Sequence, residues 1–193
     1  MTDQELWLQL QQSSKSALEQ IYQEHVTHLL QYGYRFSSDQ VLIEDAIHDL
    51  FIDIWRNRKG LSATTAIRPY LLVSLRRRII KRLQKIQKFE TDQEPQEVHF
   101  ASEMAIDEII AARETSEAQA KEIERAFQNL SKRQREALYL KFYEEMSYEE
   151  ICETMNINYQ SARNLVFNAI KTLRKYMVSV WFPLLFLLQL ITK

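Results

Sequence analysis

The stretch SYEEICETMNINYQSARNLVFNAIKTL, residues 147–173, decides how the C-terminal part of the chain folds, because it predicts two short helices joined by a tight turn. Ser147 and Glu150 have the spacing of a capping box, which starts a helix by satisfying backbone N–H groups of both residues. Asn156 is expected to form the turn, since asparagine tolerates the left-handed conformation better than other residues that carry a Cβ. Asn158 can then cap the second helix. The pattern predicts a helix-turn-helix.

The second helix of this motif has an apolar face and a polar face. The residues expected to point inward are Ala162, Leu165, Val166, Ala169 and Leu173. The opposite face carries side chains that can donate to base edges and phosphates, namely Gln160, Ser161, Arg163, Asn164 and Asn168. An ordinary helix pair with a solvated polar face would look similar. Because a helix-turn-helix places its second helix in the DNA major groove, we predict that this face binds DNA.

The composition favours an all-α protein. The 193 residues include only 2 glycines and 3 prolines, and 46% are hydrophobic. So few turn-forming residues leave little room for β-hairpins, and no stretch alternates apolar and polar residues as a strand would. The single cysteine, Cys152, excludes a disulfide framework and suits a reducing cytoplasm. The N-terminus lacks a basic start followed by an apolar run, so we expect no signal peptide and a cytoplasmic protein.

Charge is unevenly distributed along the chain, although the formal net charge is only -1. Residues 61–88 contain eight Lys or Arg and no acid, whereas residues 89–117 contain nine Asp or Glu and one base. A helix is predicted from Pro69 to about Lys88, with Leu72, Leu75, Ile79, Leu83 and Ile86 on its apolar face. Its other face carries Arg77, Arg78, Lys81, Lys85 and Lys88. A solvated face is the alternative, but solvated faces usually mix signs, so a surface for DNA phosphates is favoured.

The remaining segments complete the expected organisation. Amphipathic helices are predicted over residues 16–36 and 41–58, followed by a loop at 60–65. The acidic stretch after the cationic helix lacks helical periodicity and is predicted to be a linker between two domains. A further helical block is expected from about residue 102 to 127. Ser131 and Gln134 then form a second capping box, which starts the helix leading into the helix-turn-helix.

The C-terminal tail Val178–Ile191 is apolar on all sides, so it must be buried somewhere. A helix of this length reaches about 21 Å, short of the roughly 30 Å of a bilayer core, and Pro183 interrupts the segment. A transmembrane span is therefore not expected. Packing on the protein itself, docking to a partner and insertion into a membrane surface all stay open, with the first two favoured.

Three stretches, in this order along the chain, resemble the extracytoplasmic-function sigma factors, compact bacterial sigma factors that keep only regions two and four. IEDAIHDLFIDIW (residues 43–55) looks like the region-two helix that docks on the polymerase clamp. IRPYLLVSLRRRIIKRL (67–83) is similar to the helix that melts the promoter and reads the −10 element. LSKRQREALYLKFYEEMSYEEICETMNI (130–157) resembles region four and precedes the helix that would read the −35 element. The sequences of these three stretches are most similar to the ferric-citrate-type subgroup of Bacteroidetes-like bacteria.

The resemblance implies an all-α fold of two helical domains. It places region two at residues 1–88, an acidic linker at 89–103, region four at 104–177 and the hydrophobic tail at 178–193. It further implies a sigma factor that binds core RNA polymerase and directs it to promoter DNA. No enzymatic activity, cofactor or metal is expected, and an anti-sigma factor is the further partner expected.

The resemblance also assigns residues to each of these ligands. Core polymerase would be contacted by Asp45, His48, Asp49 and Asp53. The −10 element would be held by Arg68, Tyr70, Ser74, Arg76, Arg77, Arg78 and Lys81. The −35 element would be read by Asn158, Gln160, Ser161, Arg163, Asn164 and Asn168.

Two other classes of protein compete with this interpretation. A dimeric helix-turn-helix regulator that binds duplex DNA without polymerase would explain residues 118–177, but neither the 43–55 helix nor the cationic helix. An enzyme or metalloprotein is disfavoured, because His25 and His28 have no evident third ligand beside them and no Gly-rich phosphate loop or nucleophile motif occurs. We therefore predict a sigma factor.

Overall fold

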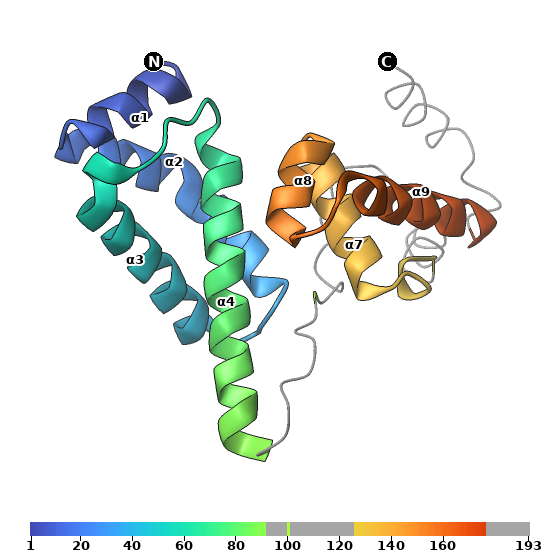
Figure 1. Ribbon diagram of the computed structural model, residues 1–193. Coiled ribbons are helices and arrows are strands. Elements are labelled where there is room, and N and C mark those ends of the chain that lie inside the picture. Colours follow the sequence, from blue (N-terminus) through green and yellow to red (C-terminus); the bar gives the residue numbers. More distant parts are fainter. Residues whose placement is uncertain (92–99, 101–125, 177–193) are drawn as a thin grey trace, which may run out of the picture. The chain divides into compact units, whose positions relative to one another are not determined.

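The computed structural model describes residues 1–91, 100 and 126–176, and every structural statement below concerns these residues. The chain divides into two compact units, Met1–Val98 and His99–Lys193 (Figure 1). All regular elements in the described ranges are helical, so the predicted all-α, two-domain fold is confirmed. None of the described helices has the length and apolar character that crossing a membrane would need.

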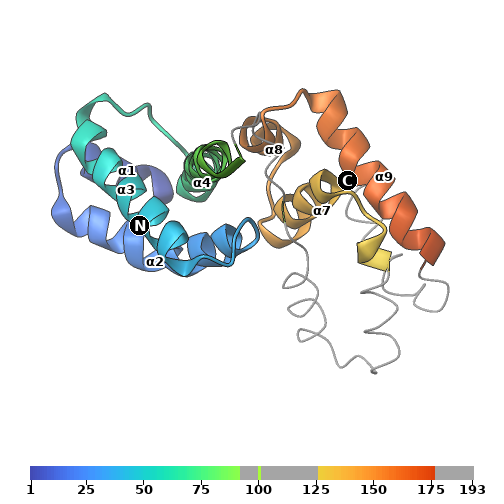
Figure 2. The same cartoon turned by 90° about the horizontal axis from the view of Figure 1, so that it is seen from below.

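Four helices and a short turn form the described part of the first unit. They are α1 (Asp3–Gln11), α2 (Lys15–Tyr34), α3 (Gln40–Asn57), the 3-10 turn η1 (Arg58–Gly60) and α4 (Ile67–Thr91). α2, α3 and α4 pack against one another in all three pairings, and α1 packs against α2 and α4. Figure 2 views α4 nearly end-on, with α2 and α3 beside it. The centre of this bundle is apolar, with Ile21, Leu29, Ile43, Leu50, Leu71, Leu72 and Leu75 fully buried.

The helix starts of this unit follow from local capping. Asp39 caps α3 by accepting a hydrogen bond from Leu42 N at 3.1 Å, and Ser14 caps α2 in the same way through Ala17 N at 3.2 Å. Gly33 lets α2 approach α3, because a Cβ at this position would overlap with Ile43 Cγ2. The bundle is therefore tight at this crossing.

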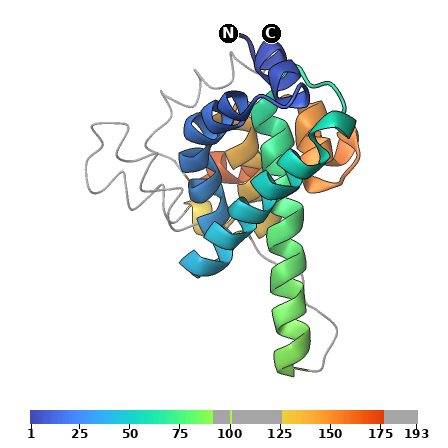
Figure 3. The same cartoon turned by 90° about the vertical axis from the view of Figure 1, so that its left-hand side faces the viewer.

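Three features of the first unit differ from the sequence-based expectations. α1 was not predicted, because its apolar stripe is short and becomes apparent only when α2 and α4 cover it. α4 continues to Thr91, into the predicted linker, since Glu90 and the Gln and Lys residues just before the linker are good helix formers. Its C-terminal half projects beyond the bundle (Figure 3), which leaves Leu83 half-buried and Ile86 exposed although both were expected to face inward.

The second unit contains, in its described part, α7 (Lys132–Leu138), the π-helical turn η2 (Tyr139–Tyr143), α8 (Tyr148–Met155) and α9 (Tyr159–Tyr176). α9 packs on both α7 and α8. The Phe100 ring is buried, with its centre 5.6 Å from that of the Tyr139 ring. Both predicted capping boxes, Ser131 with Gln134 and Ser147 with Glu150, are confirmed.

Several predicted segments lie outside the described residues. These are the linker beyond Thr91 except Phe100, the helical block from 102 up to residue 125, and the tail 178–193.

Candidate nucleic-acid interface and docking groove

The helix-turn-helix forms through local hydrogen bonds that the sequence predicted. Ser147 Oγ accepts from Glu150 N at 3.2 Å, while Ser147 N donates to Glu150 Oε2 at 2.7 Å. Asn156 ends α8 in the left-handed conformation, with φ 52° and ψ 55°. Asn158 Oδ1 accepts from Ser161 N at 2.8 Å and so caps α9. The predicted caps and turn are all confirmed, and they set the direction in which α9 leaves the turn.

α9 has the two faces that its pattern predicted. Ala162, Val166, Ala169 and Leu173 are buried, whereas Leu165 is only half-buried at the border of the two faces. Most of the predicted DNA-contacting set is exposed, namely Asn158, Gln160, Arg163, Asn164 and Asn168, while Ser161 is half-buried. Gln160 Nε2 donates to Asn164 Oδ1 at 3.1 Å, which orients two amides side by side on the exposed face.

The sequence analysis missed Phe167, which is 66% exposed on α9. At about 100° per residue, Phe167 falls among Arg163, Asn164 and Lys171 and nearly opposite the buried alanines. An apolar side chain in the major groove can contact the methyl group of thymine. Phe167 could have been found from the sequence, because it is a large aromatic residue that lies out of phase with the apolar stripe of the helix.

The cationic face of α4 is divided between the solvent and α3. Arg77 and Lys81 are exposed, whereas Arg78 and Arg82 turn toward acidic residues of α3. Arg78 Nη2 lies 2.8 Å from Asp53 Oδ2, and Arg82 Nη2 lies 2.5 Å from Asp49 Oδ2. Arg82 also donates to two backbone carbonyls of α3, those of Leu42 and Asp45. The remaining predicted −10 residues are half-buried: Arg68, Tyr70, Ser74 and Arg76.

These ion pairs also divide the predicted polymerase-binding residues. Asp49 and Asp53 pair with arginines of α4, while Asp45 and His48 are exposed and line a groove beside α3. The four positions are spaced i, i+3, i+4 and i+8, so they follow one side of α3. Two of them, Asp49 and Asp53, also have an intramolecular role in holding α3 to α4.

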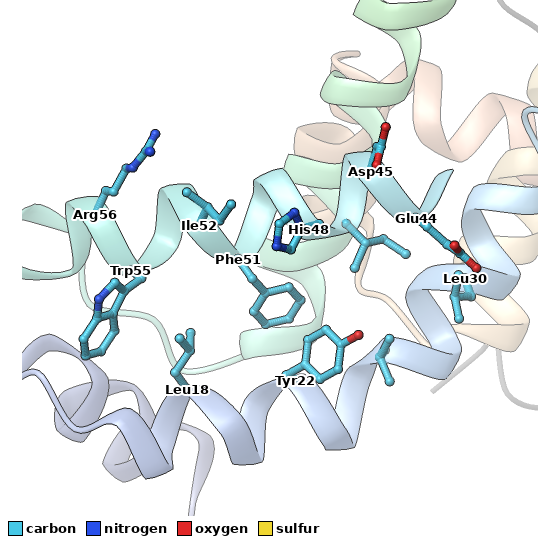
Figure 4. Close-up of a pocket in the computed structure, with 12 residues that line it drawn as sticks. Leu18, Tyr22, Leu30, Glu44, Asp45, His48, Phe51, Ile52, Trp55 and Arg56 are labelled. Carbon is cyan, nitrogen blue, oxygen red and sulfur yellow. The ribbon is translucent and has the colours of Figure 1, made fainter. Parts of the chain in front are cut away.

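A groove of about 600 Å³ runs along the surface where α2 and α3 meet (Figure 4). It is lined by Leu18, Tyr22, Val26 and Leu30 from α2 and by Glu44, Asp45, Ile47, His48, Phe51, Ile52, Trp55 and Arg56 from α3. In its middle the rings of Tyr22 and Phe51 meet edge to face, with centroids 5.0 Å apart. Glu44 lies toward one end of the groove and Arg56 toward the other (Figure 4), so an apolar floor has oppositely charged ends.

Trp55 and Tyr22 are therefore groove residues that the predicted site did not include. Trp55 is half-buried, and the Arg58 guanidinium lies 4.1 Å from the centre of its ring. This cation–π contact holds one face of the indole while leaving part of the ring to the groove.

Two family models match the sequence, "Sigma-70 region 2" over residues 21–89 and "Sigma-70, region 4" over residues 120–173. The chain belongs to the sigma-70 family. It is therefore a sigma factor that directs transcription, as predicted, and the region 2 match covers the helices that a dimeric helix-turn-helix regulator left unexplained. No curated protein matches the sequence significantly.

Solved structures show the same fold for this sigma factor. CnrH in complex with the cytosolic domain of CnrY is similar with a TM-score of 0.58 and 16% identity, over 92% of this chain and 98% of that chain. The sigma factor RpoE in complex with the anti-sigma factor NepR, from Bartonella quintana, has a TM-score of 0.57 and 17% identity, over 84% of this chain and 97% of that chain. The domains and these neighbours together support an extracytoplasmic-function sigma factor.

Proposed function

We propose that this sigma factor docks on core RNA polymerase through the groove between α2 and α3, holds the −10 element with α4 and its preceding loop, and reads the −35 element with α9. The observation that carries the proposal is the pairing of an apolar groove in the first unit with an exposed, donor-rich helix face in the second.

The shape and charge of the groove support a helical partner. An amphipathic helix buries its apolar face in such a groove, where Tyr22, Phe51 and Trp55 offer aromatic contact area. The acidic end at Glu44 and Asp45 favours basic residues at the corresponding end of the partner. The polymerase clamp, a helical coiled coil, is the partner that the family resemblance implies. Asp49 and Asp53 contribute by fixing α3 against α4.

The two DNA surfaces act in different ways. On α9, the exposed side chains of Gln160, Arg163 and Asn164 donate to base edges or phosphates, and Phe167 adds an apolar contact. On α4, the exposed Arg77 and Lys81 neutralise phosphates of the melted strand, whose unpaired bases bind by stacking and by cationic contacts.

An anti-sigma partner and the narrower subgroup are also part of the proposal. CnrH and RpoE were both solved with a bound partner, which for RpoE is named as an anti-sigma factor, and this supports such a partner here. The stretches at residues 43–55 and 130–157 support the ferric-citrate-type subgroup. The protein would act in the cytoplasm, where core polymerase is found.

Capture of purified core polymerase by the tagged full chain tests the docking surface. Ile52→Glu places a carboxylate in the groove, whereas the control Val41→Glu makes a comparable change on the same helix at a residue that is 67% exposed and outside the groove. We expect Ile52→Glu to lose capture and Val41→Glu to retain it. Equal capture by Ile52→Glu and the unchanged protein would contradict groove docking.

A further inference from the structure

We propose that α1 positions the loop at residues 61–66, so that the loop is held in its DNA-binding conformation before promoter DNA arrives. This inference rests on the proposed function, in which that loop and the start of α4 hold the −10 element. It assigns Asp3, Trp7 and Gln11 as positioning residues.

Three side chains of α1 bond to backbone atoms along this loop. Gln11 Nε2 donates to Leu61 O at 2.7 Å, and Trp7 Nε1 donates to Ser62 O at 2.9 Å. At the other end of the loop, Ile67 N donates to Asp3 Oδ2 at 2.8 Å. Residues four apart share one face of a helix, so the three positions form a single row facing the loop.

The bond to Asp3 also starts α4. Ile67 is the first residue of that helix, and the N–H groups of a first turn have no acceptor within their own helix. A carboxylate at this place satisfies one of them and interacts favourably with the positive end of the helix dipole. α1 thus sets both the path of the loop and the point at which α4 begins.

The loop's own side chains remain available to a ligand. Ser62, Ala63 and Thr65 are exposed, while Thr64 Oγ1 donates to Ala66 O at 2.9 Å and accepts from Ala66 N at 3.2 Å. Because α1 holds the carbonyls of Leu61 and Ser62, the backbone is restrained without using these side chains. When DNA binds, a loop that is already restrained loses less conformational freedom. This smaller entropic cost is the physical basis of preorganisation.

Trp7 extends the restraint into α4. Its ring lies 4.9 Å from that of Tyr70, edge to face, and Tyr70 is one of the residues assigned to the −10 element. Trp7 is itself 1% exposed, with Leu6 and Leu10 buried beside it, so α1 is fixed in the bundle and can transmit a defined position.

The test uses holoenzyme reconstituted from the full chain and core polymerase, with a pool of random single-stranded DNA 12-mers as the probe. The measured quantities are the enrichment of the selected bases, the affinity for core polymerase and the thermal midpoint of the free protein. Gln11→Glu replaces the donor with a carboxylate that repels Leu61 O. Gln9→Glu makes the same change at an exposed position of α1 and is the matched control.

We expect Gln11→Glu to lower base enrichment about tenfold and Trp7→Phe, which removes the donor together with part of the buried ring, about threefold. Core affinity should stay within about twofold for both, as for Gln9→Glu. The inference is overturned if both variants select bases as the unchanged protein does, or if core affinity falls in parallel with selection, which would make α1 merely structural. If the unchanged protein binds core polymerase but the resulting holoenzyme selects no sequence, the proposed −10 function itself fails.

Discussion

α9 and α4 both expose rows of polar or basic side chains, yet the two helices use them differently. On α9, the exposed Gln160 bonds to Asn164 of the same helix, and both amides stay on the solvent side. On α4, two arginines of a similar row bind carboxylates of the neighbouring α3. A run of charge in a sequence can therefore combine residues that are free to meet a ligand with residues that hold the fold together.

Gly33→Ala should have the largest effect and should act on the first unit alone. The added methyl group would overlap with Ile43 Cγ2 and come within 3.5 Å of Ile79 Cδ1, so α2, α3 and α4 must shift together. We expect a loss of about 2–3 kcal/mol in the free energy of unfolding, measured by urea titration with tryptophan fluorescence.

Gly60→Ala is the matched control for this change, because a Cβ at Gly60 would have nothing within 4 Å. Equal stability of the two variants would show that the tight crossing at Gly33 does not limit the bundle.

Arg163→Ala should weaken binding to the −35 duplex by about 1–3 kcal/mol if its guanidinium reads a base. The affinity of the holoenzyme for a duplex selected from a random pool measures this. Lys132→Ala, an exposed change on α7, is the control. An unchanged affinity would remove Arg163 from the proposed recognition surface.

Phe167→Ala should cost about 1 kcal/mol of duplex affinity, since burying part of a phenyl ring against DNA contributes on that scale. Unlike Arg163→Ala, it should act most at one position of the selected duplex, where a thymine is preferred. The same pool selection shows this, and retention of the thymine preference would count against the contact.

Arg77→Ala and Arg78→Ala sharpen the comparison within α4. Arg77→Ala should reduce the slope of log affinity for DNA against log salt concentration by about 1, the value of one phosphate contact, and should leave the free energy of unfolding unchanged. Arg78→Ala should lower stability by about 0.5 kcal/mol, because its ion pair with Asp53 is partly exposed and screened. A double-mutant cycle with Asp53→Asn isolates the pair, and zero coupling would show that the pair does not stabilise the contact between α3 and α4.

The smallest effect concerns pH. Burial lowers the pKa of His25 below its ordinary value of 6.5, with Asp3 and Glu24 opposing the shift. As pH falls through 6.5, the unfolded chain therefore takes up this proton before the folded one does, and the first unit loses stability. Urea titrations at pH 7.5 and 5.5 should show this loss, and His25→Gln should reduce it. An unchanged pH dependence in His25→Gln would show that another group is responsible.

Much of the second unit was predictable because its determinants are local. The capping box at Ser147, the turn at Asn156 and the cap at Asn158 each involve residues three or four apart, and all were confirmed. The burial of α9 followed its helical period closely, with Leu165 half-buried at the edge. Phe167 was overlooked because the apolar stripe was assigned to the core and the aromatic residue beside it was not weighed separately.

The first unit was predicted less completely. The helices at 16–36 and 41–58 were close to α2 and α3, yet α1, the groove and the division of the acidic residues were not foreseen. The inward position expected of Ile86 was wrong because a helical wheel cannot show where a bundle ends and α4 projects past it.

By itself the sequence determined the helical class, the helix-turn-helix and its two faces, because caps and periodicity act within a few residues of each other. Only the tertiary structure decided which charges are paired and which segment supports the loop before α4. Arg78 and Asp53 are 25 residues apart, and Asp3 and Ile67 are 64 apart. Such contacts depend on how helices pack, and the same side chains would suit solvent equally well until a neighbouring helix supplies the partner.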